Sequence, residues 1–306
     1  MSVPLRGRII VTMAKSPLSP DLKGAFLMIA GTGVLSLNDG IAKWLTEAYP
    51  VGQIMAIRGT FVIAMILVWA VAFRRTSLLR VRDWRNQSYR AVLMMLSTIA
   101  FITGLSLLPL ATAISITFAG PLITTALAIP LLGEMVGWRR WSAILIGFVG
   151  VLIMLRPSGN SAIEYAALLP IAAAMVGAFR DIVTRKMRSG ETPVAILLIS
   201  TIAVTIYGYA SASFAWVPFD WSDIWFFALT AALMAVAQLL TIEAFHQGTI
   251  GFVAPFKYTS MIWAVLIGIV VWGEMPGLSI YLGSALVIAS GFYILRREAA
   301  LRANRE

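Results

Sequence analysis

A lysine, Lys257, interrupts the apolar run FVAPFKYTSMIWAVLIGIVVW at residues 252–272. An ammonium group inside such a run is a candidate functional group, because its desolvation must be compensated. It could meet the carboxylate of a small substrate, or its stem could carry the charge back to the lipid headgroups. Tyr258 and Met261 would line an amphipathic wall for an aromatic or apolar ligand, although ordinary helix packing explains them equally well.

Other polar or aromatic side chains within apolar runs are further candidates for substrate binding. Hydroxyl and amide groups suit a small polar ligand, but serine and threonine also hydrogen-bond to their own helix backbone. Packing therefore stays open as the alternative for each of them. The candidates are Gln238, Thr241, Ser97, Phe101 and Asn38.

Two titratable residues, Glu243 and His246, stand three residues apart near the end of an apolar run. Together they could relay a proton and couple transport to it, or they could simply be solvated. His246 is the only histidine, and the chain has no cysteine. Multi-histidine and thiolate metal sites are therefore excluded, and we expect neither a metal nor a cofactor.

Acid–base pairs recur at helical spacing. Asp39 precedes Lys43 by four residues, and Asp181 precedes Arg185 by the same interval, which is the favourable order for an ion pair on one helix face. Arg58, about 10 Å below the outer surface of the membrane, could pair with Asp39. Because the pattern occurs twice, we interpret these residues as structural or gating ion pairs.

The common catalytic motifs are missing. The sequence has no phosphate-binding glycine loop, no GxSxG and no HExxH. We therefore predict that the protein is not an enzyme. A membrane enzyme that acts on lipid through carboxylates alone stays as a distant alternative.

The elements that position these residues are predicted to be membrane-spanning helices. Of 306 residues, 59% are hydrophobic and only 12% are charged, against about 25% charged in a soluble domain. A spanning helix needs about 20 mostly apolar residues. Ten such runs occur, at residues 24–45, 51–73, 90–108, 111–132, 140–156, 163–184, 193–213, 223–245, 250–272 and 278–296.

The distribution of basic residues predicts the topology. With ten spans, most of the 24 lysines and arginines fall in the N-terminal segment 1–23, in the tail 298–306 and its approach, and in the loops on the same side. Basic loops face the cytoplasm, so both termini are predicted to be cytoplasmic. The net charge of +10 is explained by this rule and by anionic lipid, so no nucleic-acid partner is expected.

An internal repeat divides the chain. The segment LLGEMVGW around Glu134 returns as VWGEMPGL around Glu274. The identities continue at the same offset to the pair Arg156 and Arg296. Five spans per half place the second half upside down, and inverted repeats with a site between them are typical of secondary transporters. Glu134 and Glu274 are predicted to cap or shape the turn that each occupies.

Ten spans in two repeats, each with a Gly-Glu turn before its last helix, resemble the EamA family of the drug/metabolite transporter superfamily. The run Pro255–Ser260, continuing to Glu274, is similar to that family's ninth helix. Within the superfamily, the chain resembles most the YddG-type exporters of aromatic and other amino acids. The resemblance implies an all-α fold with repeats at 24–156 and 163–297. It also implies a central cavity lined mainly by the third, fourth, eighth and ninth helices.

These observations predict a secondary transporter of the bacterial inner membrane, working as a monomer and moving amino acids outward with broad specificity. Export is implied by the resemblance alone. The alternative is the same fold carrying another metabolite, such as a nucleotide-linked sugar, a vitamin or a sulfonium compound. A scaffold that transports nothing would have no use for an inverted repeat.

Overall fold

The structure, a computed structural model, describes residues 20–132, 138–155, 161–186, 191–247 and 253–303. All regular secondary structure in these ranges is helical. Eight spans are single helices: α1 (Pro20–Ala48), α2 (Val51–Ala72), α3 (Trp84–Leu107), α6 (Trp138–Met154), α7 (Ser161–Lys186), α8 (Pro193–Ala210), α10 (Ile224–Gln247) and α13 (Leu278–Ala303).

The fourth and ninth spans are helical throughout but depart from a regular α-helix at one point, which the sequence does not predict. The fourth consists of α4 (Leu110–Thr117) and α5 (Ala119–Leu132), and the ninth consists of the 3-10 helix η3 (Ala254–Tyr258) followed by α12 (Thr259–Trp272). Pro121 explains the first departure, because a proline ring clashes with the carbonyl four residues earlier. Short helical turns join the spans: η1 (Thr76–Leu79), α9 (Ala212–Ala215) and η2 (Trp221–Asp223).

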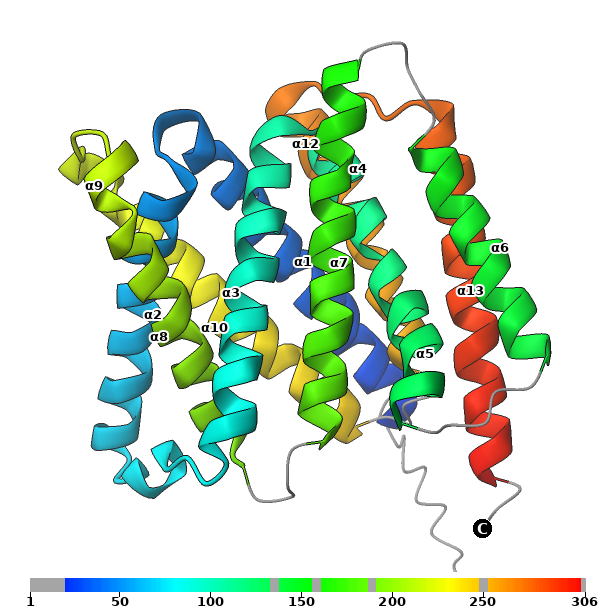
Figure 1. The fold of residues 1–306 in the computed structure, drawn as a ribbon, viewed down its shortest axis with the longest axis horizontal. Helices are drawn as coiled ribbons and strands as arrows, with labels where there is room; N and C mark the ends of the chain where they lie inside the picture. Colours follow the sequence, from blue (N-terminus) through cyan, green and yellow to red (C-terminus); the bar gives the residue numbers. More distant parts are fainter. Residues whose placement is uncertain (1–19, 133–137, 156–160, 187–190, 248–252, 304–306) are drawn as a thin grey trace, which may run out of the picture.

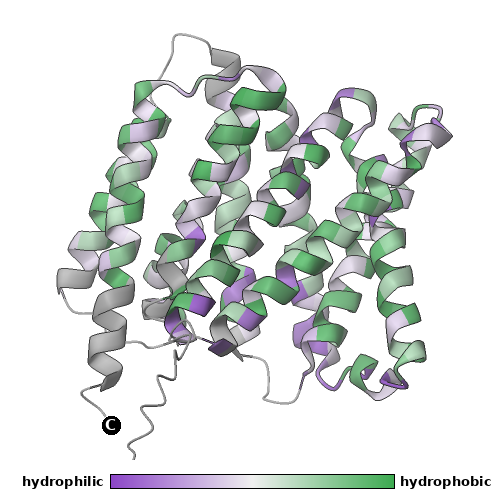
Figure 2. Ribbon diagram, turned by 180° about the vertical axis from the view of Figure 1, so that it is seen from behind, coloured by the Kyte–Doolittle hydropathy of each residue, from purple (hydrophilic) through white to green (hydrophobic). Residues whose placement is uncertain are grey.

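The prediction of ten spans in a helical membrane protein is confirmed. Among the described residues, seven helices are long and apolar enough to cross a membrane, and three shorter apolar helices complete the set. Figure 2 shows hydrophobic residues along the helices and hydrophilic residues gathered mainly toward their ends. Large apolar side chains are exposed on the outside, among them Val68, Leu152 and Val270, as expected for a surface that faces lipid.

The first, third and tenth spans extend beyond their predicted boundaries. The third begins at Trp84 instead of residue 90 because the Asp83 side chain accepts a hydrogen bond from the Asn86 backbone N–H at 3.2 Å. Such a side-chain acceptor satisfies a backbone donor that the helix itself leaves unpaired.

The two halves of the chain match in register as well as in number of spans. Helices α3 and α10 both contain 24 residues, and they begin at equivalent positions of the repeat, Trp84 and Ile224. Helices α5 and α12 both contain 14 residues and also begin at equivalent positions. The departures from regular α-helix in the fourth and ninth spans are therefore equivalent, with Phe118 at one and Tyr258 at the other, and their rings lie 5.0 Å apart.

The contacts between helices show the same correspondence between the two halves. Helix α3 packs on α7 as α10 packs on α1, and α5 packs on α7 as α12 packs on α1. Helix α2 packs on α8, and α6 packs on α13. In each of these two pairs, one helix is the repeat counterpart of the other. Figure 1 shows α2 and α8 at one edge of the bundle and α6 with α13 at the other. This is the pattern expected of two repeats related by a two-fold axis.

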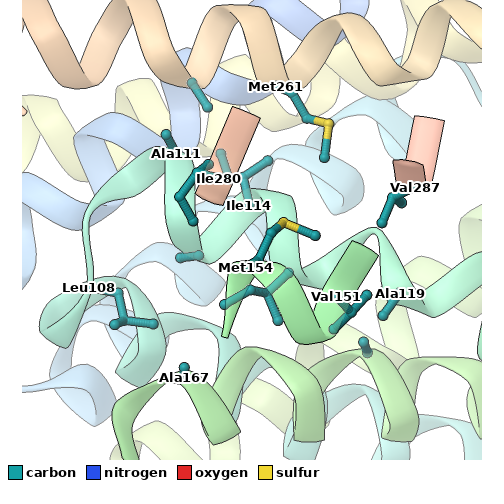
Figure 3. Packing of buried hydrophobic residues seen from close by; sticks show 14 of the residues in the cluster. Leu108, Ala111, Ile114, Ala119, Val151, Met154, Ala167, Met261, Ile280 and Val287 are labelled. Atoms are coloured by element: carbon teal, nitrogen blue, oxygen red, sulfur yellow. The ribbon is translucent and has the colours of Figure 1, made fainter. Parts of the chain in front are cut away.

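We call the end of the bundle where α1 begins and α13 ends the lower end, as drawn in Figure 1, and the opposite end the upper end. The largest buried apolar cluster joins α4, α5, α6, α7, α12 and α13. Figure 3 shows Ile114, Met154 and Met261 gathered between these helices. This core holds the fourth and ninth spans in place.

At the upper end, Tyr49 fastens the α1–α2 turn to the segment before α10. Its hydroxyl donates to Asp223 Oδ2 at 2.6 Å and accepts from the Asp220 N–H at 3.2 Å. Burial, and next the hydrogen bond to Asp223, raise the pKa of Tyr49 above its ordinary value.

Replacing Tyr49 with phenylalanine should lower the free energy of unfolding by about 2 kcal/mol, since two hydrogen bonds are lost, one of them to a carboxylate. The native protein should also lose stability in alkali. Because its pKa is higher in the folded state, the stabilisation from Tyr49 is complete below pH of about 10 and disappears as pH rises through the folded-state pKa. Thermal unfolding of the two proteins from neutral pH upward measures this, and equal alkaline slopes would contradict it.

Candidate functional site

A cavity of about 700 Å³ lies between α1, α2, α3, α4, α5, α7 and α8. Its apolar wall includes Phe101, Phe118 and Ile114. Its polar wall carries both signs of charge together with hydroxyl and amide groups: Ser36, Asn38, Asp39, Arg58, Ser97, Thr98, Thr117, Thr124, Thr125, Arg180, Asp181, Ser200, Thr201 and Ser260. Such a mixture of apolar surface and a few polar groups is typical of a small-molecule site.

The cavity is closed at the upper end. Leu105, Leu108 and Leu110 are at most 2% exposed there. Lys43 at the end of α1 donates to the Leu108 carbonyl at 2.9 Å and forms an ion pair with Glu274. The other carboxylate oxygen of Glu274 accepts from the Leu110 N–H at 2.9 Å. One carboxylate thus joins α1, the start of α4 and the end of α12.

Below this closure, Asp39 and Arg58 face the cavity from α1 and α2. The Asn38 amide donates to Asp39 Oδ1 at 3.0 Å. The Arg58 guanidinium donates to the thioether of Met234 at 2.9 Å. The Asp39 carboxylate and the Arg58 guanidinium interact electrostatically, but within the described residues no ion pair joins them directly.

A second charged group lies at the lower part of the cavity. Arg180 and Asp181, neighbours on α7, form a direct ion pair at 2.9 Å, and the Asp181 side chain is half exposed. Arg180 also donates to the thioether of Met94 at 3.2 Å. Arg90 on α3 donates to Thr184 Oγ1 at 2.9 Å and to Ser200 Oγ at 2.6 Å.

The two charged groups correspond through the repeat. Met94 and Met234 are separated by the same offset as the Gly-Glu turns, and Asn38–Asp39 precede Arg180–Asp181 by a slightly longer one. Each end of the cavity therefore presents a carboxylate, a guanidinium and a thioether. The guanidinium comes from α2 at the upper end but from α7 itself at the lower end.

The structure brings only part of the predicted binding residues to the cavity. Asn38, Ser97 and Phe101 line it, and Ser97 donates to the Ala173 carbonyl at 3.0 Å. Gln238 is exposed and faces a small gap between α2 and α10. Thr241 packs against α1 beside Gly31.

The ninth span does not present its predicted residues to the cavity wall. Tyr258 is buried against Phe118, and its hydroxyl lies over Gly291 of α13. Met261 belongs to the apolar core. Lys257 is exposed and interacts electrostatically with Asp181, so its ammonium lies near the lower charged group without lining the cavity.

The predicted ion pairs need correction. Lys43 does not pair with Asp39, as four-residue spacing suggested, because Glu274 and the Leu108 carbonyl take its ammonium. Asp181 pairs with its neighbour Arg180. The side chain of Arg185 lies outside the described residues, as do that of His246 and the whole of Glu134. Glu243 is exposed and accepts from Gln247 Nε2 at 2.6 Å.

The expectation for the cavity wall was also partly wrong. The third and fourth spans line it, but the eighth and ninth contribute only Met234 and Ser260. Helices α10 and α12 pack against α1, so α1 stands between them and most of the cavity.

Sequence reasoning missed several cavity residues. Arg180, Met94, Met234 and Ser260 were not among the candidates. The repeat could have identified Arg180, since it occupies the position equivalent to Asn38. A methionine in an apolar run gives no comparable signal.

The ten spans and the cavity that is closed at its upper end are the arrangement expected of a membrane transporter for small molecules. Residues 22–156 match the EamA-like transporter family. This match over the first half of the chain confirms the family resemblance found in the sequence.

Named relatives cover most of the chain. A riboflavin transporter of Rhizobium johnstonii is 29% identical over 279 residues, covering 90% of this chain and 91% of the relative. An S-adenosylmethionine uptake transporter of Rickettsia bellii is 25% identical over 266 residues, covering 86% and 90%. A solved crystal structure with 17% identity covers 91% of this chain and 98% of its own, with a TM-score of 0.61, and shares the fold.

Proposed function

We propose that the protein carries a vitamin-sized or sulfonium metabolite across the bacterial inner membrane by alternating access. The observation that carries the proposal is the cavity, closed at its upper end, with a carboxylate and a guanidinium at each end and with the rings of Phe101 and Phe118 on its wall. Its volume, about 700 Å³, falls within the range of about 300–1,000 Å³ that holds drug-sized ligands. A single amino acid would fill only part of it.

The first candidate substrate is S-adenosylmethionine or a compound like it. This molecule combines a carboxylate, two cationic centres and a flat base, so it matches both the charges and the aromatic wall. Asp39 and Asp181 offer acceptors for cations, and Phe101 and Phe118 offer surfaces for a ring. Relatives named for S-adenosylmethionine uptake support this choice.

Riboflavin is the second candidate. Its flat ring system and its hydroxylated chain suit a wall of aromatic, threonine and serine side chains. Relatives from Rhizobium johnstonii and Vibrio cholerae are named riboflavin transporters. Riboflavin is uncharged, however, and leaves the charges at both ends without ligand partners.

The names of these relatives favour vitamin or sulfonium transport over the amino acid export that we expected from the sequence. A nucleotide-linked sugar fits less well, because phosphates require clustered cations. Arg58 and Arg180 each have a nearby carboxylate, which leaves little net positive charge for a phosphate.

Alternating access is supported by the matched halves. The departures from regular α-helix in the fourth and ninth spans are equivalent, and inverted repeats around a central site are typical of secondary transporters. We propose that one chain suffices, since it supplies both halves. The excess of basic residues in the lower loops supports a cytoplasmic location for both termini.

Purified protein in liposomes should accumulate radiolabelled S-adenosylmethionine saturably, well above empty liposomes. Excess threonine or tryptophan should compete weakly, because neither fills the cavity. If the liposomes take up riboflavin but not S-adenosylmethionine, the second candidate is favoured. Uptake of amino acids alone would overturn the proposal in favour of the expected exporter.

A further inference from the structure

The upper part of the cavity contains buried polar atoms that the protein itself does not satisfy. Asn38 is 1% exposed and Ser260 is 7% exposed, and both line the cavity. Within the described residues, Asn38 Oδ1 and Ser260 Oγ have no hydrogen-bond partner. Because buried polar atoms in native proteins are almost always hydrogen-bonded, these two atoms point to a polar ligand.

The charges beside them retain unused bonding capacity. A guanidinium has five N–H donors, and a thioether is a weak acceptor, yet the thioether of Met234 is the partner of Arg58 at 2.9 Å. Asp39 receives the amide of Asn38 at 3.0 Å and keeps its remaining lone pairs.

The lower charged group differs in this respect. Arg180 donates twice to Asp181 Oδ1, at 2.9 Å and 3.1 Å. These two charges satisfy each other and are partly open to solvent. The upper pair is the more buried and the less satisfied by protein groups, although it carries the same chemistry.

We propose that Asp39, Asn38, Arg58 and Ser260 form a subsite for a zwitterionic α-amino-acid head group, in addition to the surface that binds the rest of the substrate. The guanidinium of Arg58 receives the carboxylate, since guanidinium–carboxylate pairs bind through parallel hydrogen bonds. Asp39 and the carbonyl oxygen of Asn38 receive the ammonium group, and the Ser260 hydroxyl donates to the carboxylate. The inference rests on the proposed function and deepens it.

This assignment replaces the structural role that the sequence suggested for Asp39 and Arg58. A head group with both charges adds no net charge to the cavity, whereas a lone carboxylate or a lone amine leaves one protein charge uncompensated. Such an uncompensated buried charge is costly. The subsite therefore selects molecules that carry both groups.

The test measures equilibrium binding to purified native protein in nanodiscs. The probes are S-adenosylmethionine, its decarboxylated form, its form without the α-amino group, and 5′-methylthioadenosine, which has no head group. Losing either charged group should weaken binding by about 10- to 100-fold, the range for hydrogen bonds to charged groups. This comparison needs no variant and so does not depend on folding.

Variants then assign each charge to its partner. Arg58→Gln should weaken the binding of S-adenosylmethionine by a similar factor but leave the affinity for the decarboxylated probe unchanged. The affinity of Arg58→Lys for S-adenosylmethionine should lie between those of Arg58→Gln and the native protein. Asp39→Asn should leave the probe without the amino group unchanged. Ser106→Ala is the control, because this exposed hydroxyl bonds only to its own helix at Thr103.

The outcomes separate the two proposals. If native protein binds 5′-methylthioadenosine as tightly as S-adenosylmethionine, the subsite is wrong while the transport proposal stands. The subsite is equally wrong if Arg180→Gln, and not Arg58→Gln, discriminates between the probes. If native protein binds none of the probes and no riboflavin, the proposed function itself fails.

Discussion

Replacing Gly283 with alanine should destabilise the protein severely by forcing α6 and α13 apart. A Cβ atom at Gly283 would lie 2.4 Å from the Gly150 carbonyl oxygen and 2.4 Å from Met154 Cγ. The carbonyl belongs to backbone and cannot rotate away as a side chain could. Overpacking of this kind costs about 1–3 kcal/mol, occasionally more, and we expect the upper part of that range.

The effect is measured by thermal unfolding and by the size-exclusion profile of the protein extracted in detergent. Gly277→Ala is the matched control, because a Cβ there meets only Ser279 Oγ, at 3.8 Å. This position is exposed and lies immediately before the same helix. Equal stability of the two variants would show that α6 and α13 do not approach as closely as the structure has them.

The contact between α6 and α13 also shows how the repeat governs packing far from the cavity. The Ser290 hydroxyl donates to the Ala143 carbonyl. Ala143 and Gly283 occupy equivalent positions of the repeat, as do Gly150 and Ser290. The repeat therefore relates the Gly283–Gly150 contact to the Ala143–Ser290 contact. A clash at either contact disturbs an interface to which both halves of the chain contribute.

The sequence alone was sufficient to predict the ten spans and the correspondence between the two halves. Apolar runs and basic loops predict where most helices begin and end to within a few residues, because lipid requires about 20 apolar residues per span, but the third begins and the tenth ends further out in polar sequence. The repeat was visible in the Gly-Glu turns around Glu134 and Glu274. It continues through the equal lengths of α3 and α10.

The site was harder to predict because its contacts cross the fold. Lys43 has an acid at helical spacing in Asp39, yet its partner is Glu274, far away in the other half of the chain. Helical spacing only says which residues share a face, and it says nothing of a closer acceptor on another helix. The prediction for Lys257 failed because an apolar run does not show which side of its helix faces the cavity, and Lys257 lies outside the cavity lining.

Glu274 nevertheless suggests how the cavity opens. Its carboxylate holds Lys43 of α1 and caps the first N–H of α4, and both partners sit in the upper closure. The closure depends on one side chain that contacts both halves. Removing its charge should therefore favour the state in which the upper end is open.

Glu274→Gln should make the upper end accessible from outside the cell. Losing one partner of a largely buried ion pair costs several kcal/mol, and a coupling of about 1–3 kcal/mol would shift the populations about 5- to 150-fold. The chain has no cysteine, so one introduced at Leu105, which is fully buried in the closure, reports alone. Its labelling rate by a membrane-impermeant maleimide in spheroplasts should rise by this factor.

Glu191→Gln provides the matched control for this result. Glu191 also accepts from backbone N–H groups, those of Arg82 at 2.6 Å and Asp83 at 2.7 Å, but it does so at the lower end. The same chemical change there should leave labelling at residue 105 from outside unchanged. If both variants label as slowly as the parent protein, the ion pair does not hold the upper end closed. If both label faster, the change reflects general loosening, and the assignment of the closure to Glu274 is wrong.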